Sequence, residues 1–199
     1  MKRILLCLVF MGFAFANGKA QTAIDINGQS GRVNRKPAVA GQFYPDDPDR
    51  LRSALKGHFR EAKGQQSELP VSAIVAPHAG YIFSGTVAAS SYKQIDPDAE
   101  YDNIFIIATS HRTQFNGASI YAEGDYETPL GNVNVNRKLA RHLINSYDIF
   151  EFREEAHSME HSLEVQLPFL QYYMKKDFQI VPIVIGTHKP ELIRKISDA

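Results

Sequence analysis

The chain alternates between short apolar runs and longer segments in which apolar residues recur every three or four positions. The short runs predict buried β-strands over 71–76, 104–108, 118–122 and 178–185. The longer spacing predicts helices over 49–62, 136–146, 158–174 and 189–199, and the small residues of 84–92 predict a helix that packs closely against a sheet. Strands that alternate with helices predict an α/β fold, a three-layer α/β sandwich with a mixed, largely parallel sheet.

Two prolines and the last predicted helix depart from this regular alternation of strands and helices. Pro168 interrupts the helical pattern of 158–174, so this helix is expected to kink or to restart there. Pro182 lies inside the strand pattern of 178–185, which favours an edge strand or a bulge. The pattern of 189–199 has neither a terminating residue nor a following strand. We therefore expect an N-terminal fragment of a longer domain.

The first residues have the layout of a secretory signal peptide. Lys2 and Arg3 give a basic start, and the apolar run of 4–15 that follows is too short to span a bilayer comfortably. Small residues then offer a cleavage site at Ala14-Phe15-Ala16 or at Gly18-Lys19-Ala20. The alternative is an uncleaved anchor.

This layout predicts the domain organisation and the cellular location of the chain. We expect a signal peptide over 1–20, a flexible lead-in over 21–36 and the folded domain over 37–199. The expected location is periplasmic or extracellular, with no stable membrane insertion once the signal is cleaved. Cys7, the one cysteine, leaves with the signal, so the mature chain would have no disulfide and no thiolate ligand of its own.

The charge balance narrows the class of partner. The 199 residues carry 22 Lys and Arg against 22 Asp and Glu, so the formal net charge is zero. A balanced charge gives no reason to expect a nucleic acid or an anionic membrane as partner. The expected partner is a small-molecule or peptide ligand.

Two predicted strands each end in a histidine. His78 follows the strand of 71–76 in Ala-Pro-His-Ala-Gly-Tyr, and His111 follows the strand of 104–108. Ligands of open α/β sheets bind at this edge, so both rings are expected in one crevice. Imidazole is the commonest metal ligand among side chains, and two histidines plus one carboxylate or thiolate suit iron(II). The alternative is two separate loop histidines that hydrogen-bond to the backbone.

A second cluster of histidines and glutamates lies between 155 and 164. His157, Glu160 and His161 match the H-x-x-E-H pattern of one class of zinc peptidase. The simpler alternative is helix capping, with the glutamates favourable in a first turn. We favour a mixed interpretation, in which His161 and Glu160 face the crevice and Glu164 is structural.

Aromatic residues flank the expected crevice in the sequence. Phe43, Tyr44 and Tyr81 are candidates for the lining of a substrate pocket. Residues of this kind are also the usual content of a hydrophobic core, and the sequence leaves both alternatives open.

Six motifs, in this order and at these separations, resemble one known family. They run from residue 40 to residue 183: Ala40-Gly41-Gln42-Phe43-Tyr44-Pro45, Ala76-Pro77-His78-Ala79-Gly80-Tyr81, Thr109-Ser110-His111, Thr128-Pro129-Leu130-Gly131, the Glu-His-Ser-Leu-Glu block of 160–164 with the residues up to 170, and Ile180-Val181-Pro182-Ile183. The chain is identified from these motifs as similar to the Memo-like family, the B component of the AmmeMemoRadiSam system, over about 35–186.

The resemblance implies a fold similar to class III extradiol ring-cleaving dioxygenases, which hold non-heme iron(II). It implies that His78 and His111 are metal ligands, that a cysteine beyond residue 199 is the third, and that His161 is a substrate-facing group. The Ala108-Thr109-Ser110-His111 of this chain departs from the Gly-Pro-Asn/Ser-His of many relatives. A signal peptide is also unexpected beside a radical partner enzyme that works in the cytoplasm.

Three functions follow as expectations. The first is a metal-binding, dioxygenase-type redox enzyme acting on a small molecule, with iron(II) on His78 and His111 and with His161 and Glu160 as catalytic residues. Copper or zinc are the alternative metals. The second is a non-catalytic peptide or ligand-binding module on the same fold. The third is a zinc peptidase that uses His157, Glu160 and His161.

If the chain is exported, its mature N-terminus can be predicted. Expression in a bacterial host should place the chain in the periplasm or the medium, beginning at Asn17 or Gln21, because cleavage follows the small residues at 16 or 20. N-terminal sequencing and intact mass would check this. A secreted chain that retains residues 1–20 would contradict cleavage.

Overall fold

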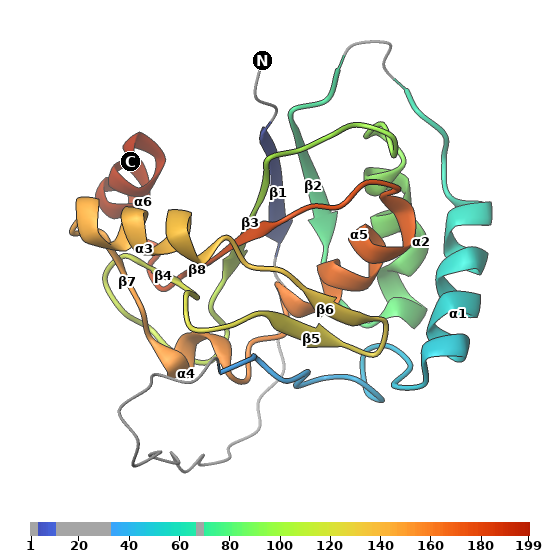
Figure 1. Cartoon of the computed structure of the whole chain (residues 1–199), viewed down its shortest axis with the longest axis horizontal. Helices are drawn as coiled ribbons and strands as arrows, with labels where there is room; N and C mark the ends of the chain where they lie inside the picture. Colours follow the sequence, from blue (N-terminus) through green and yellow to red (C-terminus); the bar gives the residue numbers. More distant parts are fainter. Residues whose placement is uncertain (1–3, 11–32, 67–69) are drawn as a thin grey trace.

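A computed structural model describes residues 33–66 and 70–199, together with the backbone of one strand near the N-terminus, β1 (Ile4–Phe10) (Figure 1). The expected cleavage sites at 14–20 and the lead-in over 21–32 lie outside the described residues, so cleavage and export stay predictions. The end of the expected lead-in belongs to the folded domain, because Arg35 is buried.

Six strands form a central mixed sheet. Besides β1 they are β2 (Ala73–Pro77), β3 (Asn103–Thr109), β8 (Ile180–Ile185), β4 (Ala118–Ile120) and β7 (Phe150–Glu151). Their order across the sheet is β2-β1-β3-β8-β4-β7. β1 is parallel to both β2 and β3, β8 is parallel to β3, and β4 is antiparallel to β8. The largely parallel, mixed sheet confirms the prediction.

Helices cover both faces of this sheet and bury two apolar clusters (Figure 1). Alternate residues of β3 divide between them: Ile104 and Ile106 belong to one cluster, and Phe105 and Ile107 pack against the other. The first cluster is completed by three helices and the second by two: α1 (Pro48–Glu61), α2 (Tyr81–Tyr92) and α5 (Leu167–Tyr173), and α3 (Arg137–Ser146) and α6 (Pro190–Asp198). This is the predicted three-layer sandwich.

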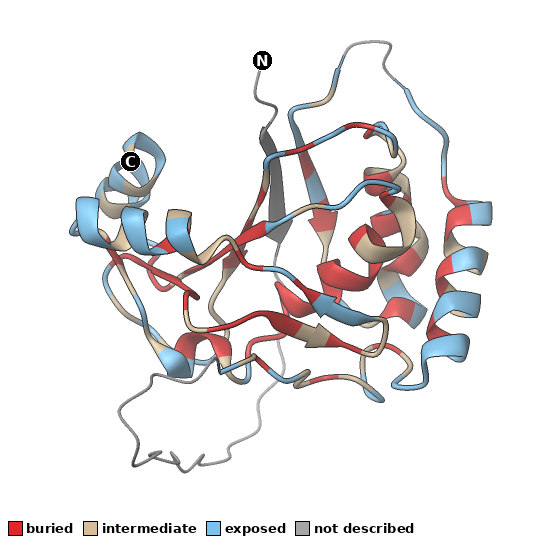
Figure 2. Cartoon of the chain, in the orientation of Figure 1, coloured by how far each residue is buried: buried red, intermediate tan, exposed pale blue. Residues whose placement is uncertain are grey.

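The inward faces of the helices follow the predicted periodicity, as the burial colours of Figure 2 show. Small residues let α2 approach its neighbours. A Cβ placed on Gly85 would lie 2.5 Å from Nε2 of His58 in α1, which is a clash with another side chain. A separate hairpin, β5 (Tyr126–Thr128) and β6 (Gly131–Val133), lies outside the six-stranded sheet. Within the described part of the chain, no helix is both long and apolar enough to cross a membrane.

The helical pattern predicted over 158–174 does not form one helix, and the restart at Pro168, one of the two expected alternatives, is confirmed. The short helix α4 (Glu154–His157) ends just before this segment, which contains a loop, one 3₁₀ turn η1 (Glu164–Gln166) and α5. The loop forms because the carboxylate of Glu160 accepts the N–H groups of His161 and Ser162, which takes them out of helical hydrogen bonding. Pro168 lies in the first turn of α5, where its missing N–H costs no helical hydrogen bond.

The edge strand or bulge predicted from Pro182 is also wrong, because β8 lies between β3 and β4 inside the sheet. The carbonyl of Pro182 accepts the N–H of Tyr121, on the side of β4. The nitrogen of a strand residue points to the same side as its carbonyl, and β4 ends at Ile120. The proline therefore sits where the ladder with β4 has finished.

A buried ion pair ties the segment before α1 to the core. The carboxylate of Glu164, which is fully buried, accepts from the guanidinium of Arg35. It also accepts the N–H groups of Ala38 at 2.8 Å and Val39 at 3.1 Å, and the hydroxyl of Tyr44 at 2.5 Å. This geometry confirms the structural role predicted for Glu164.

Removal of this carboxylate should destabilise the fold strongly. Glu164→Ala leaves the guanidinium of Arg35 buried without a counter-charge, so the free energy of unfolding should fall by about 3–5 kcal/mol. Urea denaturation would measure it. The exposed Glu191 of α6 offers a matched control, and Glu191→Ala should stay within about 0.5 kcal/mol of the parent. Equal, small losses for both variants would contradict a structural role for the ion pair.

Candidate metal centre

Three histidines from separate parts of the chain converge at the carboxyl edge of the sheet. His78 follows β2, His111 follows β3, and His161 lies in the loop before η1. One ring nitrogen from each lies within 4.8 Å of the others. The ring centroids of His78 and His111 are 5.1 Å apart, and that of His161 lies 5.6 Å and 4.5 Å from them. The prediction that His78 and His111 share one crevice is confirmed, and His161 joins them.

Three ring nitrogens at this centre are buried without a hydrogen-bond partner in the described part of the protein. They are both nitrogens of His78 and Nε2 of His111. Buried polar atoms are nearly always paired, so each such atom calls for an explanation, and an ion is one. Imidazole nitrogens bind a transition metal at about 2.1 Å, so donors on opposite sides of an ion lie about 4.2 Å apart. The cluster is close to that size, and its donors fit a transition metal.

Burial keeps the imidazoles in the form that binds metals. It lowers the pKa of His78 to about 4, and the neighbouring rings of His111 and His161 lower it further. Burial is also the main reason that the pKa of His161 lies below its usual value. At neutral pH both rings are uncharged and have lone pairs available.

The carboxylate of Glu160 orients one of these rings. Its Oε1 accepts from Nδ1 of His111 at 2.9 Å, and its Oε2 accepts from the backbone N–H of the same residue at 2.6 Å. The proton of His111 is thereby held on Nδ1, and Nε2 is left with a lone pair that faces the cluster. Oε1 also accepts the N–H groups of His161 and Ser162, each at 2.9 Å. One carboxylate therefore fixes both a side chain of the cluster and the loop that carries another.

Glu160 stays ionised despite its burial. Burial alone would raise the pKa of its carboxyl, but the hydrogen bonds from the ring and backbone of His111 and from Ser162 outweigh it and bring the pKa down to about 2. Four donors occupy its two oxygens. These contacts describe a positioning residue, and the catalytic role predicted for Glu160 stays a prediction.

His157 lies outside the cluster, which contradicts the zinc-peptidase prediction. Its Nδ1 pairs with the hydroxyl of Tyr126 at 3.0 Å, and its Nε2 pairs with the hydroxyl of Ser119 at 2.9 Å. α4 ends at His157, so His157 and His161 share no helix. Burial, together with the charge of Arg35, lowers the pKa of His157 to about 3. This ring is a satisfied core histidine.

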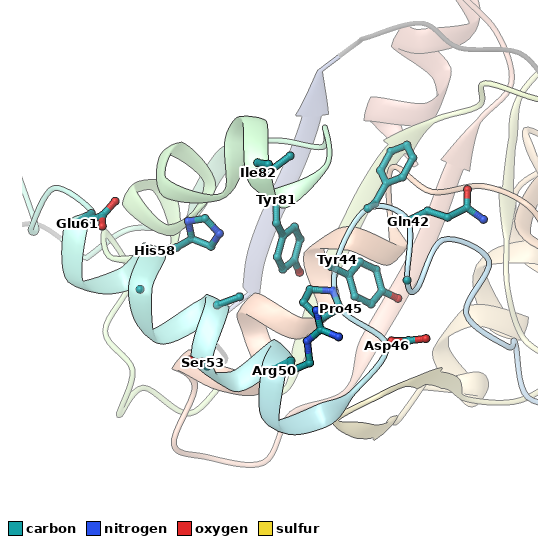
Figure 3. Close-up of a pocket in the computed structure, with 14 residues that line it drawn as sticks. Gln42, Tyr44, Pro45, Asp46, Arg50, Ser53, His58, Glu61, Tyr81 and Ile82 are labelled. Carbon is teal, nitrogen blue, oxygen red and sulfur yellow. The ribbon is translucent and has the colours of Figure 1, made fainter.

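The three predicted substrate-binding aromatics line one cavity of about 630 Å³ between α1 and the start of α2 (Figure 3). Phe43 connects this cavity to the metal centre, because its ring centroid lies 4.8 Å from that of His161. Tyr44 and Tyr81 are buried, and the hydroxyl of Tyr81 donates to the carbonyl of Val165 at 2.8 Å. Both tyrosines therefore form part of the cavity wall and offer it few free polar groups. Substrate binding by Phe43, Tyr44 and Tyr81 stays a prediction.

Sequence reasoning left two features of the centre unassigned. It placed His161 in the crevice but did not count it as a ligand beside His78 and His111, and it did not find the hydrogen bonds that His111 donates to Glu160. The adjacent Glu-His pair at 160–161 was the available signal. The pairing itself joins residues 49 positions apart, which no local pattern encodes.

Loss of the orienting carboxylate should weaken metal binding without removing it. Glu160→Gln keeps the shape of the side chain but lacks the charge that holds the proton on Nδ1 of His111, so affinity for zinc(II), used as a redox-inert probe, should fall about 10–100-fold. Competition with a chromogenic chelator would measure it. The exposed Glu155 provides the control, and Glu155→Gln should bind as the parent does. Unchanged affinity in Glu160→Gln would contradict the positioning role.

Known proteins with similar sequences identify the family of this chain. The family model for Memo-like protein matches residues 35–199. A MEMO1 family protein of Desulfurococcus amylolyticus is 43% identical over 171 residues, which cover 82% of this chain and 60% of the relative. MEMO1 family proteins of Saccharolobus islandicus and Saccharolobus solfataricus are 38% and 37% identical over 177 residues, which cover 84% of this chain and 62% of each relative. The chain thus spans about three-fifths of these relatives, and it belongs to the Memo-like protein family.

Proposed function

We propose that this chain is a metal-binding protein whose ion is held by His78, His111 and His161. The observation that supports this most is that one ring nitrogen from each of the three histidines lies within 4.8 Å of the others. Buried ring nitrogens of His78 and His111 also have no hydrogen-bond partner among the described residues. We propose iron(II) as the metal, with copper or zinc as alternatives, because imidazole suits all three. The family resemblance to iron(II) dioxygenase-like proteins favours iron.

The chemistry proposed for the centre is redox or dioxygenase-type turnover of a small molecule. Three histidine ligands would leave coordination positions open, and an iron(II) ion there would supply the reaction with oxygen. The protein's own part is to keep His78 and His161 uncharged by burial, and to hold the proton of His111 on Nδ1 through Glu160. Phe43 would exclude water on the side of His161 and meet the substrate there.

A second candidate function uses the same centre without turnover. The 630 Å³ cavity beside Phe43 supports a module that binds a small ligand or a peptide end, in which the metal is structural. Oxygen consumption with catechol-like substrates, with and without iron(II), separates the two. Iron-dependent consumption supports the enzyme, and its absence in the iron-loaded chain supports the binding module.

We also propose that the protein works outside the cytoplasm, on the strength of the leader layout of residues 1–20. The balanced charge supports a small-molecule or peptide partner over a nucleic acid.

Metal content tests the proposed centre directly. The double variant His78→Ala/His111→Ala removes two of three donors, so purified protein loaded anaerobically with iron(II) should fall from about one equivalent of iron to background. Elemental analysis after desalting would check it. His142→Ala, on the solvent side of α3, is the matched control and should load normally. Full loading of the double variant would overturn the centre.

The variant His161→Ala tests whether His161 is a metal ligand or an acid–base group. As a ligand, His161→Ala should lower iron(II) occupancy together with any turnover. As the catalytic acid or base first predicted for it, the same variant should keep its iron and lose turnover alone. Parallel measurement of iron content and oxygen consumption distinguishes the two. Unchanged iron and unchanged turnover would contradict both roles.

A further inference from the structure

One wall of the 630 Å³ cavity is a single face of α1. It is formed by Arg50, Ser53, Ala54, Gly57 and Glu61 (Figure 3). Residues at intervals of three and four lie on the same side of a helix, so these side chains face the cavity together. The buried apolar residues of α1 lie on its other side, against the core. The cavity wall is therefore a part of α1 that packing of the fold leaves open.

Polar side chains on this wall and on the loop opposite have no partner inside the protein. Within the residues that the structure describes, the side chains of Arg50, Ser53 and Gln42 take part in no hydrogen bond or ion pair, although all three line the cavity. They are exposed. A ligand can therefore bind them without first breaking a contact within the protein.

Arg50 provides a positive charge between the two ends of the cavity. Asp46 and Glu61 also line it, but neither carboxylate forms an ion pair with the Arg50 guanidinium, and Glu61 pairs with Arg60 at 3.6 Å. Figure 3 shows Asp46 and Glu61 at opposite ends, with the Arg50 side chain between them and beside Pro45. A guanidinium binds a carboxylate through two parallel N–H···O hydrogen bonds. Arg50 therefore favours a ligand with a carboxylate.

The opposite wall of the cavity is aromatic and uncharged. Tyr44 and Tyr81 are buried, and their ring centroids lie 5.4 Å apart. His58 adds an imidazole that is uncharged at neutral pH, because burial lowers its pKa, and its Nδ1 pairs with the hydroxyl of Thr86 at 3.1 Å. Apolar groups gain free energy when such a wall removes them from water. This wall favours a ligand with an apolar side chain.

Gly57 leaves room for that side chain. A Cβ placed on Gly57 would have no atom within 4 Å, so the cavity reaches the backbone of α1 at this point. The seven residues from Arg50 to Gly57 advance the helix by about 10 Å. An extended chain covers this distance with about three residues. The space between the guanidinium and Gly57 therefore matches a ligand of the size of one to three amino acids.

We propose that this cavity binds a carboxylate next to an amide and an apolar side chain, as in an acylated amino acid or the C-terminal end of a short peptide. Arg50 binds the carboxylate, Ser53 and Gln42 bind the amide groups, and the apolar side chain lies against Tyr81 toward Gly57. The inference rests on the proposed role of this cavity as a ligand site, and it is independent of the metal.

A matched pair of peptides tests the carboxylate. The probes are N-acetyl-Ala-Ala-Phe as the free acid and as the C-terminal amide, titrated calorimetrically into the full 199-residue chain after treatment with a chelator. The acid should bind about tenfold or more tightly than the amide, because hydrogen bonds to a charged group are stronger than those to a neutral one. Equal affinities, or no binding of either peptide, would overturn the proposal.

A third probe, N-acetyl-phenylalanine, distinguishes the two sources of this chemistry. Affinity equal to that of the tripeptide acid assigns an acylated amino acid, because the added residues then make no contact. Tighter binding of the tripeptide assigns the end of a peptide.

Two variants test whether the ligand lies in the cavity. Arg50→Gln should remove the preference for the acid, while Arg52→Gln, the same charge change on α1 outside the cavity lining, should keep it. Gly57→Leu should fill the open space and weaken binding of the acid by about tenfold or more. Its circular dichroism should match the parent, because no atom lies within 4 Å of the new Cβ. A preference for the acid retained in Arg50→Gln, or full affinity in Gly57→Leu, would contradict the assignment.

The metal centre is the competing site for a carboxylate. The acid should bind the chelator-treated chain and the iron-loaded chain equally, because Arg50 lies in the cavity and not among the histidines. Binding that requires iron would place the carboxylate at the centre and overturn the proposal. A chain that takes up iron but binds none of the probes contradicts this inference alone, and one that binds the acid but no iron contradicts the proposed metal function alone.

Discussion

The position of the metal centre depends on the buried charge of Glu164. An ionised carboxylate in a core needs both a counter-charge and hydrogen bonds, and Arg35 supplies the first while Ala38, Val39 and Tyr44 supply the rest. The guanidinium of Arg35 has donors left over. They bind the carbonyl oxygens of His157 at 3.1 Å and Glu160 at 2.5 Å. A single ion pair therefore holds both the segment before α1 and the loop that brings Glu160 and His161 to the sheet edge.

The centre combines two histidines at strand ends with one histidine in a loop. His78 and His111 follow β2 and β3, which are both parallel to β1 between them, so the sheet itself sets their separation. His161 has no such support, because it lies between α4 and η1. Glu160 makes the connection: it accepts from the ring of His111 and from the backbone of His161. One carboxylate therefore positions the loop relative to the strand end. The burial of this carboxylate is tolerated because four N–H donors occupy its oxygens.

The sequence by itself determined the fold class and predicted two of the three histidines of the centre as metal ligands, with the third in the same crevice. The alternation of strand and helix patterns predicted the sandwich, and apolar runs that end in His78 and His111 predicted one shared crevice, because period and chain order are local properties. The chain pattern failed between 158 and 174. There the helical spacing is real, but the hydrogen bonds that distant backbone N–H groups donate to the carboxylates of Glu160 and Glu164 outweigh helix formation.

Tertiary structure alone decided the remaining features. Pro182 is inside the sheet because β4 ends at Ile120, a fact about a strand more than sixty residues away. His157 and His161 are four residues apart, yet one is satisfied by Tyr126 and Ser119 and the other faces His78. Their separation follows from the end of α4, which the helical spacing does not mark. Which histidine is free to bind a ligand is decided by its partners across the fold, and these are absent from any local pattern.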